Sequence, residues 1–494
     1  MPRLSWTPGR VVGFVAGLVA FGLLAFLDSP LRHDPEHGAR PALAAGIAAL
    51  MAIWWLTEAL PIYVTACVPL LAYPLFRPFG PGFFKNVGAT LDAYLDPYIF
   101  LFAGGMAIAA AMQRWDLHRR IALNIMDAIG TDPKRLLAGF LCATAFISLW
   151  ISNTATATMM VPIGIAVLVQ IELQRGGGRL RHYGMAIMLA IAYGSNVGGI
   201  GTKIGTAPNA QFAGFAERFG IEISFLQFMA VGLPFVVVFL PIVWWFLWRI
   251  GRGDELGETM GATAIADEIG KLGRIRREER IVLGVFLVTA ALWIGGKLLT
   301  GLLKPWVTSF ALTSAHVEGG IAMLAALTLL LWRSRGQAVL NFQALKKVPW
   351  ETLLLLGGGF AMASAIQASG LSNQVGAQLL GLRSFPPFAQ ILLASLVTVA
   401  LSAVASNTAT IAVMLVVLQQ AVAAQHLPSV LFAATIAASC DFALPAGTPP
   451  NAIVFGSGYV RIPVMARIGL QLDLLAASVA ALWCWAVVPY VLGR

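Results

Sequence analysis

Two copies of the tripeptide Ser-Asn-Thr are the residues of this chain best suited to chemistry. Ser152-Asn153-Thr154 reappears as Ser406-Asn407-Thr408, 254 positions later. A serine precedes each copy by four positions, Ser148 in the first and Ser402 in the second. Hydroxyl and carboxamide groups are costly to bury in apolar surroundings unless they find partners. The repeat therefore predicts a binding site to which both copies contribute.

A second repeated motif follows each tripeptide and is expected to unwind a helix. Gly205-Thr206-Ala207-Pro208-Asn209 corresponds to Gly447-Thr448-Pro449-Pro450-Asn451, 242 positions later. Proline lacks an amide donor and clashes with the preceding turn, while glycine lets another backbone approach closely. Ala207 stands where the second copy has Pro449, so the first break is expected to be the looser one.

These residue types suit a cation and an anion side by side. Short hydroxyls, carboxamide oxygens and unwound carbonyls can replace the water shell of a sodium ion without charge repulsion. Helix N-termini and amide or hydroxyl donors can face a carboxylate. The alternative is that the hydroxyls only bond back to their own helices and the prolines only kink them. Two matching copies with matching partners argue against that alternative.

The composition indicates that a membrane surrounds the elements that position these residues. The chain has 494 residues, of which 58% are hydrophobic and 11% charged, whereas soluble domains carry about 25% charged residues. We predict an all-α polytopic protein with about 11 transmembrane helices, the first of them retained rather than cleaved. The expected spans are 11–27, 42–60, 61–77, 97–113, 185–215, 225–249, 281–300, 317–332, 350–368, 430–460 and 467–491.

Two further apolar regions, 137–172 and 388–424, are each interrupted by Ser-Asn-Thr and are predicted to be re-entrant helical hairpins. Basic residues cluster on both sides of the first hairpin and in 249–280, whereas 425–429 has none. Because positive loops are cytoplasmic, the first hairpin is expected to enter from the cytoplasm and the second from outside. Eleven spans would then place the N-terminus inside and the C-terminus outside.

Halves that enter from opposite sides form an inverted repeat, which places a binding site at their interface near the midplane. The expected division is 1–96 for N-terminal scaffold helices, 97–250 for the first repeat with its broken helix 185–215, 251–349 for a cytoplasmic loop and scaffold helices, and 350–494 for the second repeat with its broken helix 430–460 and the last helix. The 251–280 loop forms either an amphipathic surface helix or a solvated linker.

At these motifs the chain resembles the divalent anion/sodium symporter family, the INDY-like di- and tricarboxylate carriers. Besides both Ser-Asn-Thr motifs, the resemblance rests on residues 54–61 (Trp-Trp-Leu-Thr-Glu-Ala-Leu-Pro) and 444–455 (Leu-Pro-Ala-Gly-Thr-Pro-Pro-Asn-Ala-Ile-Val-Phe), and it covers essentially the whole chain. It implies an elevator-type transporter of the cytoplasmic (inner) membrane, in which a scaffold domain forms a homodimer and a transport domain moves.

The resemblance also implies two sodium sites and one substrate site. The first sodium site would use Ser148, Ser152, Asn153 and the backbone of Gly205, and the second Ser402, Ala405, Asn407 and the backbone of Gly447. Substrate carboxylates would meet Asn153, Thr154, Thr206, Asn407, Thr408, Thr448 and Pro449.

Ionisable residues near these sites are candidates for coupling, since charges within spans usually have a function. Lys203 lies two positions before Gly205, and Asp441 lies six positions before Gly447. A fixed Lys203 ammonium group could replace the first sodium ion, which would suit an exchanger or a proton-linked carrier. Otherwise Lys203 reaches the membrane surface or pairs with an acid such as Asp441. Glu58 is expected to cap a helix N-terminus or to have a scaffold role rather than to bind substrate, because its charge would repel a carboxylate.

The sequence thus predicts sodium-coupled symport of C4-dicarboxylates such as succinate, malate and fumarate. An exchanger or proton-linked carrier that does not use sodium, and a sulfate/sodium symporter, remain alternatives. An enzyme is not expected, because no nucleophile–base pair is visible and no histidine adjoins Ser-Asn-Thr. Hairpins from both sides favour alternating access over a channel. The net charge of +10 lies in short loops and indicates topology rather than nucleic-acid binding.

Overall fold

Prolines and capping side chains start the helices that carry the repeat. The computed structural model describes residues 7–254, 262–378 and 383–493. This part of the chain is almost entirely helical, with one antiparallel pair of short strands, β1 (Arg333–Ser334) and β2 (Gln337–Ala338). Asp96 accepts from the Tyr98 amide at the start of α6 (Pro97–Arg114), and Asp132 from the Arg135 amide at the start of α8 (Pro133–Ser148). Each acid precedes a proline, which suits the first helical turn.

The N-terminal helices divide where the sequence analysis expected one continuous span over 61–77. The helix is interrupted at Cys67, just before Pro69, but the two pieces follow each other as one apolar helical stretch, Ile62–Phe76. A further helix, which the sequence analysis did not assign, leads into α6. The elements of this region are α1 (Pro8–Phe26), the 3₁₀ turn η1 (Pro30–Arg32), α2 (Arg40–Leu56), α3 (Ile62–Ala66), α4 (Val68–Phe76) and α5 (Phe83–Tyr94).

The first half of the repeat contains a helical hairpin and a broken helix, at the positions that the motifs indicate. The hairpin turns at Ser-Asn-Thr between α8 and α9 (Asn153–Gln174), and the helix break lies between α10 (Arg181–Gly199) and α11 (Ala207–Arg218). Pro208 still occupies the first turn of α11 although Ala207 precedes it. The remaining helices of this half are α7 (Leu117–Ile129) and α12 (Phe225–Gly251).

The connecting region contains the second departure from the expected spans. The span expected over 281–300 bends by 69° between α14 (Arg277–Ile294) and α15 (Gly296–Leu303). Helix α13 (Ala262–Leu272) covers part of the 251–280 loop, of which residues 255–261 lie outside the described residues. This region also contains α16 (Ser314–Leu331) and α17 (Phe342–Leu345).

The second half repeats the arrangement of the first. A hairpin turns at Ser-Asn-Thr between α21 (Pro387–Ser402) and α22 (Asn407–Ala421), and a helix is broken between α23 (Leu427–Ser439) and α24 (Pro449–Gly456). The other helices are α18 (Trp350–Ala368), α19 (Leu371–Gln378) and α25 (Ile462–Leu492).

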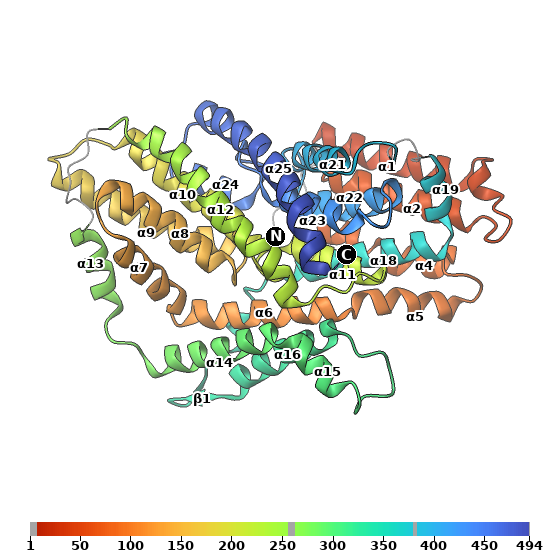
Figure 1. The fold of residues 1–494 in the computed structure, drawn as a ribbon, viewed down its shortest axis with the longest axis horizontal. Helices are drawn as coiled ribbons and strands as arrows, with labels where there is room; N and C mark the ends of the chain where they lie inside the picture. Colours follow the sequence, from red (N-terminus) through yellow and green to blue (C-terminus); the bar gives the residue numbers. More distant parts are fainter. Residues whose placement is uncertain (1–6, 255–261, 379–382, 494) are drawn as a thin grey trace.

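Helices α10 and α23 form the centre of the molecule and carry the two breaks into it. From Tyr183 onwards every residue of α10 is buried, as is every residue of α23. Helices that are apolar on all sides belong in a core. Each packs against the hairpin of its own half, while α24 contacts α9 and α11 contacts α22, so the two halves interlock. Figure 1 shows the hairpin helices α8 and α9 beside α10 and α12, with α24 next to α10, and helices α21, α22 and α23 grouped on the other side of the centre.

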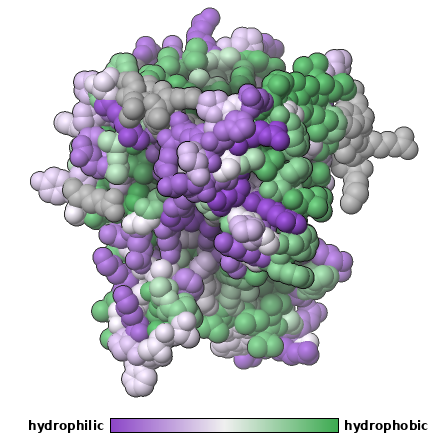
Figure 2. Space-filling model, turned by 90° about the vertical axis from the view of Figure 1, so that its right-hand side faces the viewer, coloured by the Kyte–Doolittle hydropathy of each residue, from purple (hydrophilic) through white to green (hydrophobic). Residues whose placement is uncertain are grey.

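The surface and the helix lengths fit a bilayer. Seven of the described helices are long and apolar enough to cross a membrane, or eight if the bent pair α14–α15 counts as one span. The remaining expected spans fall on helices that are shorter or broken. Large apolar side chains such as Leu71, Leu298 and Leu331 are exposed, and Figure 2 shows wide hydrophobic areas on the outside. Exposed apolar areas of this size mark a surface that contacts lipid or protein.

Candidate functional site

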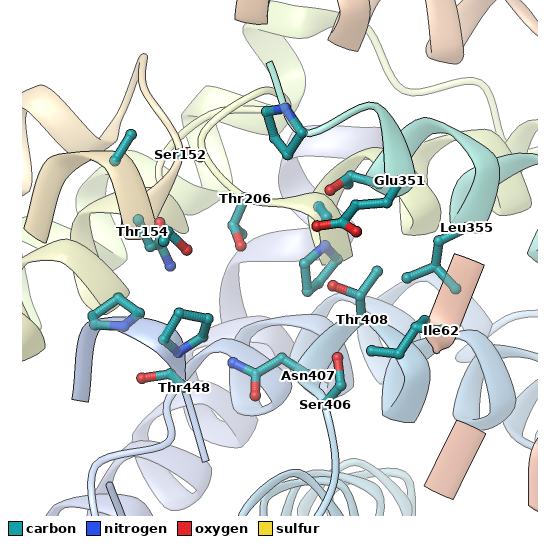
Figure 3. A pocket seen from close by; sticks show the side chains of 18 of the residues that line it. Ile62, Ser152, Thr154, Thr206, Glu351, Leu355, Ser406, Asn407, Thr408 and Thr448 are labelled. Atoms are coloured by element: carbon teal, nitrogen blue, oxygen red, sulfur yellow. The ribbon is translucent and has the colours of Figure 1, made fainter. Parts of the chain in front are cut away.

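A cavity of about 770 Å³ lies where the two hairpin tips and the two helix breaks meet. Figure 3 shows Thr154 and Thr206 of the first half and Asn407, Thr408 and Thr448 of the second half around the same space. Every residue predicted to meet a substrate carboxylate lines it, namely Asn153, Thr154, Thr206, Asn407, Thr408, Thr448 and Pro449. Residues separated by more than half the chain are thus brought together.

The other cavity walls come from elements that the sequence analysis did not assign to the site. Helices α3, α6 and α18 contribute apolar side chains, among them Ile62, Phe102 and Leu355. The charged lining residues are Glu58, Lys347 and Glu351, and all of them are exposed. They therefore lie at the open end, and the inner walls at the motifs are neutral and polar. A neutral wall needs another source of positive charge if it is to hold a divalent anion.

The first hairpin tip gathers several oxygen atoms at one point. Ser148 Oγ lies 2.7 Å from the carbonyl oxygen of Ser195 and 2.9 Å from Asn153 Oδ1. A hydroxyl group has a single proton to donate. Ser148 can therefore donate a hydrogen bond to only one of these two oxygens, and the other lies close to the hydroxyl oxygen without a hydrogen bond. Such a group of neutral oxygens is the kind of environment that a sodium ion favours.

The second hairpin tip reproduces this geometry. Ser402 Oγ lies 2.8 Å from the carbonyl oxygen of Ala438 and 2.9 Å from Asn407 Oδ1. Both serines are fully buried behind the cavity wall, and Ala405 is buried as well. The two copies of the tripeptide therefore share their hydrogen-bond partners as well as their sequence. Ser195 and Ala438 contribute only their backbone oxygens to these groups, and sequence reasoning did not single them out.

The asparagines of the second motif hold the unwound segments. Asn209 Nδ2 lies 2.9 Å from the Gly199 carbonyl oxygen and 2.7 Å from that of Thr202. Asn451 Nδ2 lies 3.1 Å from the Asp441 carbonyl oxygen and 2.9 Å from that of Leu444. The acceptors stand ten and seven positions before the asparagine in both halves. Gly199 and Asp441 are thus structurally equivalent, and so are Thr202 and Leu444.

Glycine is required where the broken helix meets the hairpin. A Cβ atom added at Gly205 would lie 2.9 Å from the Ser148 carbonyl oxygen and closer still to that of Gly199. The first predicted sodium site, with Ser148, Asn153 and Gly205, is therefore a contiguous set of oxygens. Ser152 borders the same region and lines the cavity. At Gly447 an added Cβ would collide with the carboxylate of Asp441.

Asn196 is a site residue that the sequence analysis missed. It lines the cavity and is fully buried on α10. Its Nδ2 lies 3.2 Å from Thr448 Oγ1 and 3.1 Å from the Asp441 carbonyl oxygen, so it links the first half to the second. The signal that could have found it is the polar pair Ser195-Asn196 within an otherwise apolar helix.

Lys203 pairs with an acid, as one of the expectations held, but that acid is Glu318 rather than Asp441. Its ammonium nitrogen lies 2.7 Å from Glu318 Oε2 of α16, and both side chains are fully buried. Glu318 Oε1 also accepts from the Phe225 amide at 2.7 Å, and the Tyr98 ring lies 5.1 Å from the ammonium group. Sequence reasoning did not single out Glu318. The positive charge of Lys203 is thus balanced outside the cavity lining.

Glu58 ends a helix rather than beginning one. It adopts a left-handed backbone with φ of 47° just after α2. The Glu58 amide bonds the Trp55 carbonyl and the Ala59 amide that of Trp54, which is the Schellman pattern of a helix C-terminus. The expected N-terminal capping role is therefore wrong. Its side chain lines the open end of the cavity.

The chain is similar to known membrane transport proteins in sequence and in fold. The sequence model described as the sodium:sulfate symporter transmembrane region matches residues 11–491. The sodium-dependent dicarboxylate transporter SdcS of Staphylococcus saprophyticus is 36% identical over 99% of this chain and 93% of its own length. Its counterpart in Staphylococcus aureus strain USA300 is 35% identical over 99% and 94%. The crystal structure of the YdaH transporter of Alcanivorax borkumensis has the same fold, with a TM-score of 0.55, 13% identity, and coverage of 90% of this chain and 98% of that one.

Proposed function

Because the chain belongs to the sodium:sulfate symporter family, which confirms its resemblance to the divalent anion/sodium symporters, we propose that it is a secondary active transporter that carries C4-dicarboxylates together with sodium. The observation that carries the proposal is the cavity walled by both Ser-Asn-Thr tips. Relatives over nearly the full length are named sodium-dependent dicarboxylate transporters. Succinate, malate and fumarate are the substrates that we propose.

The cavity offers donors for both ends of a short dianion. Asn153, Thr154 and Thr206 stand on one wall, and Asn407, Thr408 and Thr448 stand on the other. Amide and hydroxyl donors orient a carboxylate without the charge of an arginine or lysine. Since the inner walls are neutral, sodium ions at the two tips supply the positive charge that a dicarboxylate needs. This explains why substrate and sodium would bind together.

We further propose one sodium site at each tip, on account of the matching oxygen groups. Ser148 and Asn153 with the Gly205 backbone would form the first site, and Ser402 and Asn407 with the Ala405 and Gly447 backbones the second. Each hydroxyl lies close to two other oxygens, an arrangement that a bound cation stabilises.

The residues at the open end of the cavity indicate the side of the membrane to which the cavity opens in this conformation. The exposed lining residues Lys347 and Glu351 follow a stretch that contains Arg333, Arg335 and Lys346. Since basic loops are cytoplasmic, we propose that the cavity opens to the cytoplasm, with the N-terminus inside and the C-terminus outside. The elevator movement, the homodimer and the cytoplasmic (inner) membrane location are proposed from the family resemblance.

Uptake of labelled succinate into proteoliposomes tests the function directly. We expect uptake to rise at least about tenfold when an inward sodium gradient replaces a choline gradient, since a neutral site holds a dianion poorly without cations. Succinate inside the vesicles should not be required. Equal uptake in sodium and choline would contradict sodium coupling, and a strict need for internal succinate would indicate an exchanger.

Sulfate is the second candidate substrate, favoured by the description of the family. A sulfate ion is also divalent and would use the same donors. Unlabelled sulfate in excess should leave succinate uptake largely unchanged if dicarboxylates are the true substrates. Strong competition by sulfate with weak competition by malate and fumarate would favour the sulfate symporter.

A further inference from the structure

The carboxylate of Asp441 is buried without a hydrogen-bond or ion-pair partner among the described residues. Its side chain is fully buried in the segment between α23 and α24, and neither Oδ1 nor Oδ2 has a donor. A buried polar group without a partner costs free energy, and an acid costs the most. A carboxylate kept in such a place implies a ligand that supplies the missing positive charge.

The direction of this side chain points to the second predicted sodium site. A Cβ atom added at Gly447 would collide with both carboxylate oxygens of Asp441, so the carboxylate lies directly against Gly447. Gly447 lines the cavity, and its backbone is a predicted sodium ligand. Asp441 therefore stands immediately behind the wall at this site.

The internal repeat gives the same placement independently. Asn209 and Asn451 hold the carbonyl oxygens of Gly199 and Asp441 in the same way, which makes those two positions equivalent. A Cβ atom at Gly199 would collide with Asn153 Oδ1, a predicted ligand of the first sodium ion. A side chain at position 441 is thus directed towards the corresponding place beside Asn407. The first half has glycine where the second half has an acid.

The neighbours of Asp441 are acceptors rather than cations. The Oδ1 atoms of Asn196 and Asn451 also lack partners among the described residues, although both amide nitrogens bond the Asp441 carbonyl oxygen. Asp473, the nearby acid, is different because its Oδ1 accepts from the Phe442 amide at 2.8 Å. Lys203 forms an ion pair with Glu318 instead. An oxygen-rich pocket with one carboxylate is suited to a hard cation.

We infer that the Asp441 carboxylate is a ligand of the cation at the second hairpin tip, so that this site is anionic while its counterpart in the first half is neutral. This inference rests on the proposed function, because it assumes that sodium binds at the tips. Ligand charge raises the affinity of a cation site. The second site would then fill at a lower sodium concentration than the first, and it would do so before any dicarboxylate is bound.

Sodium binding to the purified protein without substrate tests this order. Thermal unfolding in detergent would be followed while sodium chloride replaces choline chloride at constant ionic strength, since a ligand that binds only the folded state raises the unfolding temperature. We expect Asp441→Asn to shift the sodium concentration of half-maximal stabilisation upwards by roughly tenfold. Asp473→Asn is the matched control, because it removes a neighbouring charge but keeps the oxygen that accepts from Phe442. It should stay within about twofold of the wild type.

The possible outcomes separate this inference from the function on which it rests. Equal sodium responses of Asp441→Asn and the wild type would overturn the inference and leave sodium coupling intact. A wild type that does not respond to sodium and shows no sodium-driven uptake would overturn the proposed function itself. Asp441→Gly, which copies Gly199, replaces Asp441→Asn if the latter does not fold. Failure of both to fold, with Asp473→Asn folded, would assign Asp441 a structural role and reject the inference.

Discussion

The residues at the two hairpin tips form matched pairs with equivalent contacts. We therefore expect the two members of each pair to have the same function. Asn153 and Asn407 each lie 2.9 Å from a buried serine hydroxyl and line the same cavity. We propose that each asparagine offers its oxygen to the cation and its amide group to the substrate. One side chain can therefore connect the binding of the two solutes, which is the physical requirement for coupling.

Replacing either asparagine should abolish coupled transport without unfolding the protein. In Asn153→Ala or Asn407→Ala a contact to a charged group is lost, which costs about 1.5–3 kcal/mol, or roughly tenfold or more in affinity. Succinate uptake at low sodium should fall by at least that factor, while gel filtration still shows a monodisperse protein. Asn124→Ala, at an exposed position of α7, serves as control. Near-normal uptake in either tip variant would refute the proposed site.

The first broken helix is joined to neighbouring helices by two ion pairs, one fully buried and one half-buried. Lys203, in the unwound segment after α10, binds Glu318 of α16. Arg218, at the end of α11, lies 2.5 Å from Asp96 at the start of α6. Both pairs therefore connect the first broken helix to the layer formed by α6 and α16, which lie side by side in Figure 1. The role of Lys203 that we now propose is to fix this segment in place.

Breaking the Lys203–Glu318 pair on one side should destabilise the protein strongly. Lys203→Met or Glu318→Gln leaves one buried charge unpaired, which costs about 3–5 kcal/mol. Thermal unfolding in detergent should show a large drop for each single variant. The double variant Lys203→Met/Glu318→Leu should regain much of that loss, because it removes both charges. If Lys203→Met were as stable as the wild type but no longer required sodium for uptake, a coupling role would be favoured.

The whole molecule is an internally repeated helical protein with apolar areas on its outer surface, an apolar core, and a polar cavity between its two halves. Figure 2 shows the apolar areas on the outside, and the neutral polar cavity lies where the two halves interlock. The distribution of basic residues among the short loops predicts that the two halves have opposite orientations in the membrane. That orientation determines which side of the membrane the open end of the cavity faces.

Labelling of single cysteines tests this orientation. In a background without the four native cysteines, Arg274→Cys should react with a membrane-impermeant maleimide only from the cytoplasmic side. Gln425→Cys, in the loop between α22 and α23, should react only from outside. Both positions are exposed, so that access depends on sidedness and not on burial. Labelling of both cysteines from the same side would reject the inverted topology.

Sequence alone determined the repeat, the hairpins and those cavity-lining residues that belong to the repeated motifs. The reason is that these features are local: a polar tripeptide interrupts an apolar run, and the combination of glycine and proline in each repeated motif disfavours a continuous helix. Two copies at constant offsets then implied one shared site. The boundaries of α12, α18 and α25 follow from apolar length in the same way, which is why the expected spans lie close to them.

Tertiary structure decided which charged side chains meet and which stay alone. Glu318 lies 115 positions from Lys203, and no periodicity or motif connects the two. The sequence marked Asp441 as unusual, but only the folded chain shows its carboxylate against Gly447 and without a donor among the described residues. Pairing depends on distances in space, which an apolar pattern along the chain does not encode.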